Sequence, residues 1–581
     1  MFKSKIKQCQ SCNIKFTIEP EDFEFYKKID VPEPTFCPEC RAKRRLSFRD
    51  GMMLHKRKVE KFDKDVFSSI SPSSSFNIYH SDYWWSDELD AIKNGRDYDF
   101  SKPFFKQMEE LMREVGLPHL SNINPVNSPY CGNVVEVKNC YWIFNGGMSE
   151  NCAYGIDMVG CRDSYDLVTV NNSELSYGLF DCDKCYQVFF STECKESSNV
   201  WFSKNLVNCQ NCFGCTNLRH KNYHIFNEPY SKEDYEEKIK EFNLGSYKAF
   251  IELKEKAKES HLKFPNKYMH GNKNVNITGD YINNSKNAKE CFVSRDLEDC
   301  SYCQMILFAP SKECHDIVIA GGELNYEISI GGGYKIKFCW LNMPKDLKNL
   351  DYGLYENEYV IGTMNSSNLF GCVGLRHKQY CILNKQYTKE SFNKLRTKII
   401  KHMNDMPYTD KKGRIYKYGE FFPPELSPFG YNETIANEYF PLTKEQAIAQ
   451  GYNWYNKPKS EYKPTIKASN LPDNIKDVDS SILKEVIECE NVRPLGSNKC
   501  TGSGVFRLIP TELKFYKKMN LPLPRLCPDC RHRERIKQRN PLKLWKRQCM
   551  KPGCKTTFET TYSPERPEII YCESCYNKEV S

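Results

Sequence analysis

Cysteine pairs near the start of this chain have the spacing of a structural zinc site. Cys9-Gln-Ser-Cys12 and Cys37-Pro-Glu-Cys40 are two Cys-x-x-Cys pairs with residues 13–36 between them. Four thiolates give zinc a closed tetrahedral shell, which leaves no position for a reactive water. We therefore predict a zinc site at Cys9, Cys12, Cys37 and Cys40 that organises the surrounding loops and catalyses no hydrolysis.

A related module lies at the other end of the chain, where residues 23–59 recur almost without gaps as residues 513–549. A second complete set of four thiolates follows in this copy: Cys549, Cys554, Cys572 and Cys575. The copy lacks the first Cys-x-x-Cys pair, so a third set needs a more widely spaced combination: Cys489, Cys500, Cys527 and Cys530. We predict zinc at the two complete sets and a third zinc ion at this one.

The N-terminal copy has no counterpart of the second set. Val59, His80 and Tyr83 align with cysteines of the C-terminal module. This half-module is therefore predicted to be metal-free and to be held by packing, through Tyr83, Trp84 and Trp85.

A dense run of basic residues follows the Cys-Pro-x-Cys pair in both modules. Residues 41–58 and residues 531–547 each contain eight Lys/Arg and one acidic residue. Such a run attracts phosphates by releasing counterions, and Arg also pairs with phosphate bidentately. We predict RNA or DNA contacts from ten residues: Arg41, Lys43, Arg44, Arg45, Arg49, Arg531, Arg533, Arg535, Lys537 and Arg539. The alternative is a basic face that pairs with the acidic middle of the same chain or docks a protein partner.

Charge is unevenly distributed along the chain. Residues 1–60 hold 14 Lys/Arg against 9 Asp/Glu, and residues 483–581 hold 20 against 11, although the formal net charge is only +9. The middle must therefore be net negative. The N-terminus has no apolar signal region, and no apolar run approaches the roughly 18 residues of a membrane span, so we expect a cytoplasmic protein without a membrane partner. In a reducing compartment its 29 cysteines would bind metal or pack in the interior.

The middle of the chain is duplicated, because residues 211–223 return as residues 368–380. Within each lobe, Cys, Asn or Ser stands just before an aromatic residue at intervals of 9 to 13 residues. This spacing is typical of a β-solenoid with one strand and turn per unit, or with two units in a coil of about 20 to 24 residues. We predict a β-rich, multidomain chain with zinc ribbons at both ends of two solenoid-like lobes.

Most of the 17 cysteines in these lobes are interpreted as a buried column of small apolar residues. Cys140, Cys152, Cys182, Cys291 and Cys339 are expected to point inward. Additional metal ligands are the alternative for the more closely spaced cysteines.

One polar motif, Leu-Arg-His-Lys, places His220 and His377 at equivalent positions of the two lobes. It could bind an anion or transfer protons, but a motif repeated near the end of each lobe is more typical of a capping turn. The chain has neither a Gly-x-Ser-x-Gly nor a Walker A motif. We predict a zinc-binding protein that binds nucleic acid and is not an enzyme. The alternative is a structural scaffold or protein-interaction protein whose ribbons dock partners, and a solenoid enzyme acting on polysaccharide is a distant alternative.

Helical patterns frame the lobes. Residues 103–115 carry an apolar stripe that predicts a core-facing helix, and residues 231–260 and 388–404 are similar. The predicted segments are a zinc ribbon with its basic run, a metal-free half-ribbon with a helix, lobe 1, lobe 2, an extended region with a linker, and a double zinc ribbon. Their ranges are 1–60, 61–124, 125–270, 271–405, 406–482 and 483–581.

The cysteine modules resemble the probable zinc-ribbon domain of small bacterial proteins. The residues that carry the resemblance are Cys9-x-x-Cys12, Phe16, Phe25-Tyr26, Pro34 and Cys37-x-x-Cys40-Arg41, together with Tyr571-Cys572-Glu-Ser-Cys575 at the other end. The layout looks like that of large uncharacterised bacterial multi-zinc-ribbon proteins. The resemblance covers about a fifth of the chain and implies zinc at the cysteines named. It implies no enzymatic activity.

Overall fold

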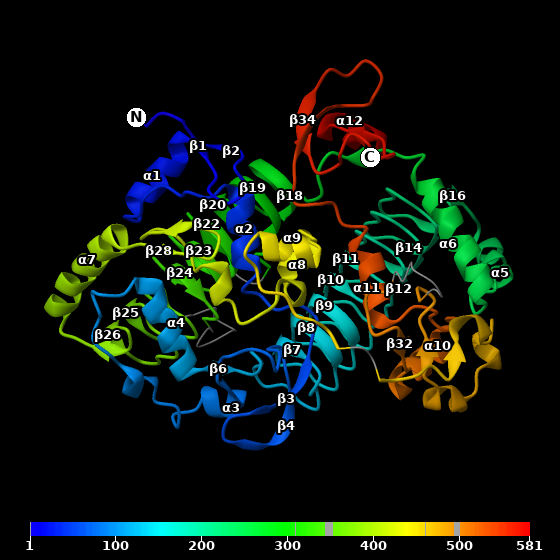
Figure 1. Cartoon of the computed structure of the whole chain (residues 1–581). Coiled ribbons are helices and arrows are strands. Elements are labelled where there is room, and N and C mark those ends of the chain that lie inside the picture. Colours follow the sequence, from blue (N-terminus) through cyan, green and yellow to red (C-terminus); the bar gives the residue numbers. More distant parts are fainter. Residues whose placement is uncertain (1, 308–309, 343–352, 459–460, 493–499, 581) are drawn as a thin grey trace.

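The computed structural model describes residues 2–307, 310–342, 353–458, 461–492 and 500–580. Two solenoid lobes of short parallel strands form the middle, and the terminal modules, drawn in blue and in orange to red, lie against them (Figure 1). The predicted β-rich fold with a solenoid-like middle and flanking helices is confirmed. Parts of the predicted lobe 2 and of the linker, residues 308–309, 343–352 and 459–460, lie outside the described ranges. Within those ranges, no helix has the length and apolar character needed to cross a bilayer.

Lobe 1 stacks short coils, and equivalent positions of neighbouring coils are 12 residues apart. Val168 of β10 (Val168–Asn171) pairs in parallel with Ile156 of β9 (Ala153–Val159) and with Phe180 of β11 (Phe180–Asp183). The other strands are β7 (Gly132–Val135), β8 (Tyr141–Gly147), β12 (Tyr186–Phe189), β13 (Ser198–Trp201), β14 (Gln210–Phe213), β15 (Asn222–Ile225) and the antiparallel β16 (Glu228–Pro229). Each unit is therefore one coil, and the alternative of a longer coil built from two units is wrong for this lobe.

The coils of lobe 1 turn at closely spaced corners. Positive φ angles recur at every third position, as at Asn133, Glu136, Asn139 and Trp142, with values of 55°, 50°, 52° and 58°. Asn and Asp enter this left-handed region more readily than other residues with side chains. Their abundance in the repeats therefore fits the corners. Asn side chains also form ladders between coils, and the Asn127 amide donates to the Asn139 amide oxygen at 2.9 Å.

A coil this short encloses room for small side chains. Cys140, Cys152, Cys182, Cys291 and Cys339 are all buried, so the predicted inward orientation is confirmed. The Cys152 thiol donates to the carbonyl oxygen of the second residue before it at 3.3 Å. In the next coil, the Ser164 hydroxyl makes the same bond at 2.7 Å. Cys and Ser therefore occupy equivalent interior positions, because both are small and both can donate to the backbone.

Lobe 2 repeats the design, with equivalent positions mostly 11 or 12 residues apart. Ile317 of β22 (His315–Glu323) pairs in parallel with Ile328 of β23 (Tyr326–Tyr334). The other strands are β18 (Val275–Asn283), β19 (Lys286–Arg295), β20 (Leu297–Ser301), β21 (Ser311–Lys312), β24 (Lys337–Trp340), β25 (Ser367–Phe370), β26 (Gln379–Ile382) and the antiparallel β27 (Lys385–Gln386).

The predicted helices close the lobes. Helix α4 (Phe104–Val115) buries every residue of its predicted apolar stripe. Phe104 packs against lobe 2, where it meets Tyr359 and Phe370 edge to face. Helix α5 (Lys232–Glu241) packs on β15 and α7 (Lys389–Asp405) packs on β26, each after the last parallel strand of its lobe. Helix α6 (Tyr247–His261) follows α5.

The N-terminal half-module, for which no metal was predicted, packs against the rest of the chain. It begins with the hairpin of β3 (His55–Val59) and β4 (Phe62–Ser68). Val59 lies in the main hydrophobic core. Trp84 of α3 (Ser81–Trp84) is buried, and its indole N–H donates to the carbonyl oxygen of Gly116 at 3.2 Å.

The remaining elements are short. In the N-terminal region they are β1 (Lys5–Gln8), β2 (Lys15–Ile18), α1 (Pro20–Lys28), α2 (Pro38–Leu46), β5 (Ile78–Tyr79), η1 (Ala91–Asn94) and β6 (Leu117–Pro118). After lobe 2 they are β28 (Tyr408–Thr409), β29 (Ile415–Tyr416), η2 (Pro424–Leu426), η3 (Tyr431–Glu433), α8 (Ile435–Tyr439), α9 (Lys444–Ala449), β30 (Ile466–Lys467), η4 (Ala468–Asn470), η5 (Ile475–Asp477) and η6 (Ser480–Lys484). The C-terminal module contains β31 (Ile487–Glu488), β32 (Val505–Phe506), α10 (Pro510–Met519), α11 (Pro528–Ile536), β33 (Trp545–Gln548), β34 (Thr557–Thr560), β35 (Ile570–Tyr571) and α12 (Glu573–Val580), with β35 pairing with β17 (Asn266–Lys267).

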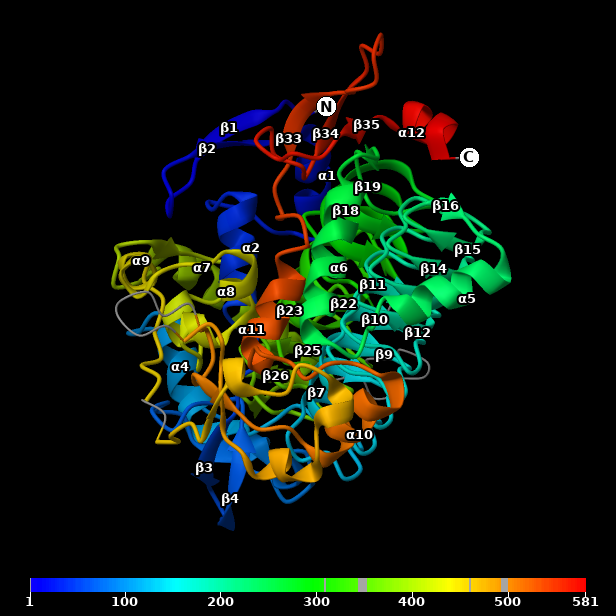
Figure 2. The ribbon, with the colours of Figure 1, turned by 90° about the vertical axis from the view of Figure 1, so that its right-hand side faces the viewer.

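The terminal modules dock crosswise on the lobes. Helix α2, which starts at the second cysteine pair of the N-terminal module, packs on β22 and β23 of lobe 2. Helix α11, its counterpart in the C-terminal module, packs on β10 of lobe 1 (Figure 2). The sequence run that follows each cysteine pair is therefore the part of the module that meets a solenoid.

Candidate metal centres and docked basic helices

All twelve predicted cysteine ligands gather into three sets of four. Within each set the sulfur atoms lie within 4.8 Å of one another. The sets are Cys9/Cys12/Cys37/Cys40, Cys489/Cys500/Cys527/Cys530 and Cys549/Cys554/Cys572/Cys575. Each set could hold one metal ion, including the set that lacks a first Cys-x-x-Cys pair.

The three sets share one local hydrogen bond. The backbone N–H of Cys37, at the N-cap of α2, donates to the Cys9 sulfur at 3.3 Å. Cys527, at the N-cap of α11, makes the same bond to Cys489 at the same distance. Cys572 makes it to Cys549, again at 3.3 Å. Such N–H donors stabilise thiolates, which are the metal-binding form of cysteine.

Two of the less buried cysteines are shifted toward the thiolate form. The pKa of Cys500 is lowered to about 7 by hydrogen bonding with its neighbour Cys489. Hydrogen bonding with Thr556 lowers the pKa of Cys554 to about 6. In the same set as Cys554, hydrogen bonding with Cys572 raises the pKa of Cys575 to about 12. Sulfur atoms this close together cannot all be thiolates unless a cation neutralises their charge, which fits a metal site.

Most of the predicted nucleic-acid contacts are buried. Arg41, Arg44, Arg45, Arg49, Arg531 and Arg535 are inaccessible to solvent, Lys43 and Arg539 are half-buried, and Arg533 and Lys537 are exposed. The prediction of an open phosphate-binding surface is wrong for the six buried arginines. Their guanidinium groups are already paired with polar groups of the chain itself.

In the N-terminal module, arginines of α2 form ion pairs with two carboxylates of lobe 2. Arg41 and Arg45 both reach Asp316, each at 2.9 Å. Arg44 and Arg45 reach Glu327 at 2.8 Å and 3.1 Å. All five side chains are almost wholly excluded from water. Asp316 and Glu327 belong to β22 and β23, so these ion pairs join the module to the solenoid.

The C-terminal module forms equivalent ion pairs with lobe 1. Arg531 reaches Asp166 at 2.8 Å, and Arg535 reaches the other oxygen of Asp166 at 3.1 Å. Asp166 is 1% exposed. Arg531 also pairs with Glu512 of α10 at 3.1 Å. We call each arrangement of two arginines, one helical turn apart, around one solenoid aspartate an arginine clamp.

The two arginine clamps correspond position by position. Arg41 and Arg531 are equivalent in the alignment that relates the two modules, and so are Arg45 and Arg535. Arg41 and Arg531 each also lie over a solenoid tyrosine, with the guanidinium carbon 5.3 Å from the ring centre of Tyr302 and 4.9 Å from that of Tyr154. The duplication thus includes an entire interface as well as a cysteine pattern.

Aromatic contacts beside the clamps are duplicated as well. Tyr26 of α1 packs on Tyr326 of lobe 2 with ring centres 5.5 Å apart. Tyr516 of α10, its counterpart in the alignment of the modules, packs on Tyr177 of lobe 1, also at 5.5 Å. Each module therefore has a second helix that contributes to the same dock.

Burial and charge act against each other in these ion pairs. Burial by itself would raise the pKa of Asp316, but Arg41 and Arg45 outweigh it and lower that pKa. Burial raises the pKa of Glu327, and Arg44 only partly opposes this. Removing water from such groups is unfavourable unless each keeps its partner. A phosphate could reach these arginines only if the module first left its lobe.

The carboxylates of the clamps were missed by sequence reasoning. Asp166 and Asp316 belong to no recognisable motif, and the net negative charge of the middle was the only signal that pointed to them. The sequence left open that the basic runs pair with the acidic middle of the same chain. The arginines of the two clamps do so.

The Leu-Arg-His-Lys motif is part of the lobe ends. His220 and His377 occupy corresponding corners, where Nδ1 contacts the amides of Asn208 and Asn365 at 2.9 Å and 2.7 Å. An asparagine closes the final coil of each lobe at the same position, and in lobe 2 Asn384 bridges both backbone groups of Val373. This geometry supports a capping role.

Comparison of the chain with protein-family models, with curated proteins and with solved structures finds no match. The resemblance to zinc ribbons therefore stays a prediction that rests on the cysteine patterns, and functional inference depends on the geometry described above.

Proposed function

We propose that this protein is a non-enzymatic, zinc-stabilised scaffold whose terminal ribbons hold two solenoid lobes in a fixed arrangement for partner binding. The observation that carries this proposal is the arginine clamp, made once on each lobe by equivalent helices. Equivalent faces of α2 and α11 are buried against the two lobes, which indicates that these faces hold the modules on the lobes. Partners would then meet the exposed faces of the lobes and modules.

The choice of zinc rests on the donor atoms. All ligands in the three sets are cysteine sulfurs, and four thiolates in a closed tetrahedral shell are typical of structural zinc. Zinc would tie the loops before α2 and α11 to the first turns of those helices, because the ligands lie at both places. The free energy of metal binding would thereby stabilise the docked helices. Because the sites require free thiols, the proposal includes a reducing compartment such as the cytoplasm.

Nucleic-acid binding is a second candidate, supported by the basic residues that the docks leave exposed. In the C-terminal module these form the basic set of Arg533, Lys537, Lys543 and Lys546. Arg539, next to them, lies over the ring of Tyr439, with its guanidinium carbon 3.6 Å from the ring centre. Basic and aromatic groups together can hold a single strand.

A titration with nucleic acid separates the two candidates. The metal-loaded full chain would be titrated with fluorescent single-stranded RNA and double-stranded DNA at several salt concentrations, and the anisotropy measured. The scaffold proposal predicts no salt-sensitive binding that depends specifically on the basic set. Binding that weakens with salt, and whose log–log slope falls by about four when the basic set is changed to Ala, would instead establish nucleic-acid contacts.

The titration has a matched control on another surface. Helix α7 also carries four exposed lysines: Lys389, Lys394, Lys398 and Lys401. Changing these to Ala removes the same charge from the chain but leaves the basic set intact. Equal losses from both variants would show non-specific attraction to the net charge of the protein, which would leave the scaffold proposal standing.

A further inference from the structure

A cavity lies where lobe 1, the segment between the lobes and the C-terminal module meet. Its volume is about 270 Å³. Lobe 1 contributes Asp181, Glu193 and Lys195, the connecting segment contributes His270, and the C-terminal module contributes Tyr562 and Tyr576. Ligand pockets for drug-sized molecules span roughly 300 to 1,000 Å³, so this cavity suits a smaller polar molecule.

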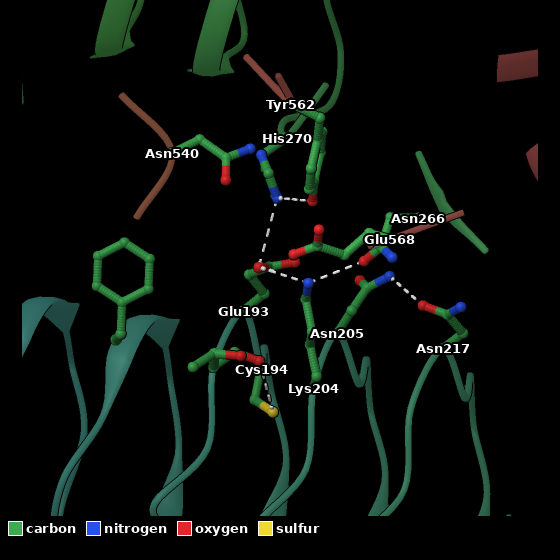
Figure 3. A network of polar contacts seen from close by, with 12 residues as sticks. Glu193, Cys194, Lys204, Asn205, Asn217, Asn266, His270, Asn540, Tyr562 and Glu568 are labelled. Atoms are coloured by element: carbon green, nitrogen blue, oxygen red, sulfur yellow. Dashed lines mark hydrogen bonds and ion pairs between the residues drawn. The ribbon is translucent and has the colours of Figure 1, made fainter. Parts of the chain in front are cut away.

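One wall of the cavity consists of charged and polar side chains that pair with one another (Figure 3). His270 Nδ1 lies 2.9 Å from a carboxylate oxygen of Asp280, and its Nε2 lies 3.4 Å from Glu193 and 3.0 Å from the Tyr562 hydroxyl. Lys204 lies 3.7 Å from the same oxygen of Glu193. These groups satisfy one another. The network joins both lobes to the C-terminal module, and its charges are not free for a ligand.

Asp181 differs from these groups because its carboxylate has no hydrogen-bond or ion-pair partner among the described residues. It stands at a corner of β11 with φ of 50° and lines the cavity. Burial raises the pKa of this carboxyl to about 6. The side chain is half-buried. Partial removal of a carboxylate from water without a partner is unfavourable, and pairing with a cationic ligand would reduce this cost.

Lys195 also lines the cavity, from the next coil of lobe 1. Its charge favours the ionised form of Asp181 and so opposes the effect of burial on the pKa of that carboxyl. No ion pair joins the two side chains among the described residues. The Lys195 ammonium likewise has no partner among the residues that the structure describes. A carboxylate and an ammonium thus face one small cavity without touching each other.

We propose that this cavity binds a zwitterion, specifically a free α-amino acid. Its ammonium would pair with Asp181 and its carboxylate with Lys195, so both unpartnered groups, which are half-buried, gain an opposite charge. The amide side chain of Asn272, which also lines the cavity, can accept or donate a remaining hydrogen bond. The inference goes beyond the scaffold role and does not depend on it.

The C-terminal module forms part of the cavity wall, so the site requires that module to be docked. The Tyr576 hydroxyl donates to Asn217 of lobe 1 at 3.0 Å. Tyr576 directly follows Cys575, a member of the set Cys549/Cys554/Cys572/Cys575, in the chain. The binding experiment must therefore use the metal-loaded full chain.

Isothermal titration calorimetry would test the zwitterion proposal. The twenty proteinogenic L-amino acids would first be ranked individually at millimolar concentration by the thermal shift they produce. The tightest one would then be titrated beside its two single-charge analogues, the corresponding amine without the carboxylate and the carboxylic acid without the amino group. We expect each analogue to bind at least about tenfold more weakly, because each leaves one charge of the cavity unpaired.

Two substitutions assign the binding to this cavity. Asp181→Asn and Lys195→Met should each weaken the binding of the amino acid at least about tenfold. Asp183→Asn and Lys184→Met, on neighbouring positions that do not line the cavity, should leave the affinity unchanged. Asn is suited to the left-handed corner at position 181, and circular dichroism would verify folding of all four variants.

Three results would overturn the proposal. The first is that none of the twenty amino acids binds the wild-type protein. The second is that an amine or an acid alone binds as tightly as the amino acid. The third is that both folded cavity variants bind like the wild type. None of these results bears on nucleic-acid binding or on the clamps, so the scaffold proposal is tested separately.

Discussion

The arginine clamp on lobe 1 makes a quantitative prediction at Asp166. Changing Asp166 to Asn removes the charge shared by Arg531 and Arg535 but keeps the size of the side chain. Both guanidinium groups remain at most 8% exposed, and they would lose the counterion that now lies 2.8 Å and 3.1 Å away. Removing one partner of a buried ion pair destabilises proteins by about 3 to 5 kcal/mol. Glu512 still pairs with Arg531, so we expect the lower end, about 3 kcal/mol.

The loss should appear as local opening of the C-terminal module. A chain of this size has no single unfolding free energy, so the assay is hydrogen exchange of α11 followed by mass spectrometry in the native state. A loss of about 3 kcal/mol corresponds to roughly a hundredfold higher opening constant. Exchange in α2 should stay unchanged, because Asp316 holds that helix on the other lobe.

Asp163→Asn is the matched control for this experiment. Asp163 is a corner residue on the preceding side of the same coil, where its carboxylate accepts from the Asn151 amide at 3.0 Å. Its substitution should leave exchange in α11 within about twofold of the wild type, since surface changes of this kind are worth at most about 0.5 kcal/mol. If Asp166→Asn also changed exchange by less than about fivefold, or about 1 kcal/mol, the clamp would not be what holds the module.

Three further predictions follow from the same structure. Chelation should release metal, unfold the loops around Cys37, Cys527 and Cys572, and leave the lobes folded, as mass-resolved proteolysis would detect. Within the lobes, Cys152→Ser should be tolerated because serine fills the equivalent position one coil later, whereas Cys152→Leu overfills the coil and should lower stability by about 1 to 3 kcal/mol in thermal melts. The His270 network should weaken in alkali. Burial alone would lower the pKa of His270, but Asp280 and Glu193 raise it to about 10, so its contribution is complete below about pH 6.5 and is lost toward pH 10, which a melting series across that range would reveal.

The cysteine sets were predictable because their information is local. Four sulfurs need only short loops to meet, and the spacing of Cys9, Cys12, Cys37 and Cys40 satisfies that requirement in the sequence itself. The buried column of the lobes was predictable for a similar reason, since every coil repeats the same small residues. The length of one coil was harder to predict. Corners recur at every third position, and the Asn, Asp and Glu residues found there are compatible with short coils and with longer ones.

The role of the basic runs could not be predicted from their charge. Arg41 and Arg45 stand one helical turn apart and therefore share a face, but nothing in the module says whether that face meets phosphate or carboxylate. The deciding residue is Asp316, which lies far from Arg41 in the sequence and has no distinguishing neighbours. Contacts of such sequence separation depend on the tertiary fold, which a single sequence reveals only coarsely.

The differences between the two modules indicate which feature the architecture requires. The N-terminal half-module has Val59 and Tyr83 where its counterpart has cysteines, and the C-terminal module has Cys489 and Cys500 in place of a first Cys-x-x-Cys pair. The cysteine pattern thus differs between the two copies. The arginine clamp is the same in both, because two arginines, one aspartate and one tyrosine recur on each lobe. Because a buried charge cluster is destabilising unless it is complete, losing any one member from a copy would weaken that dock. Metal bound at the cysteine sets would stabilise each module, whereas the clamps hold it on its lobe, so attachment of both modules to the lobes is the property that the two halves share.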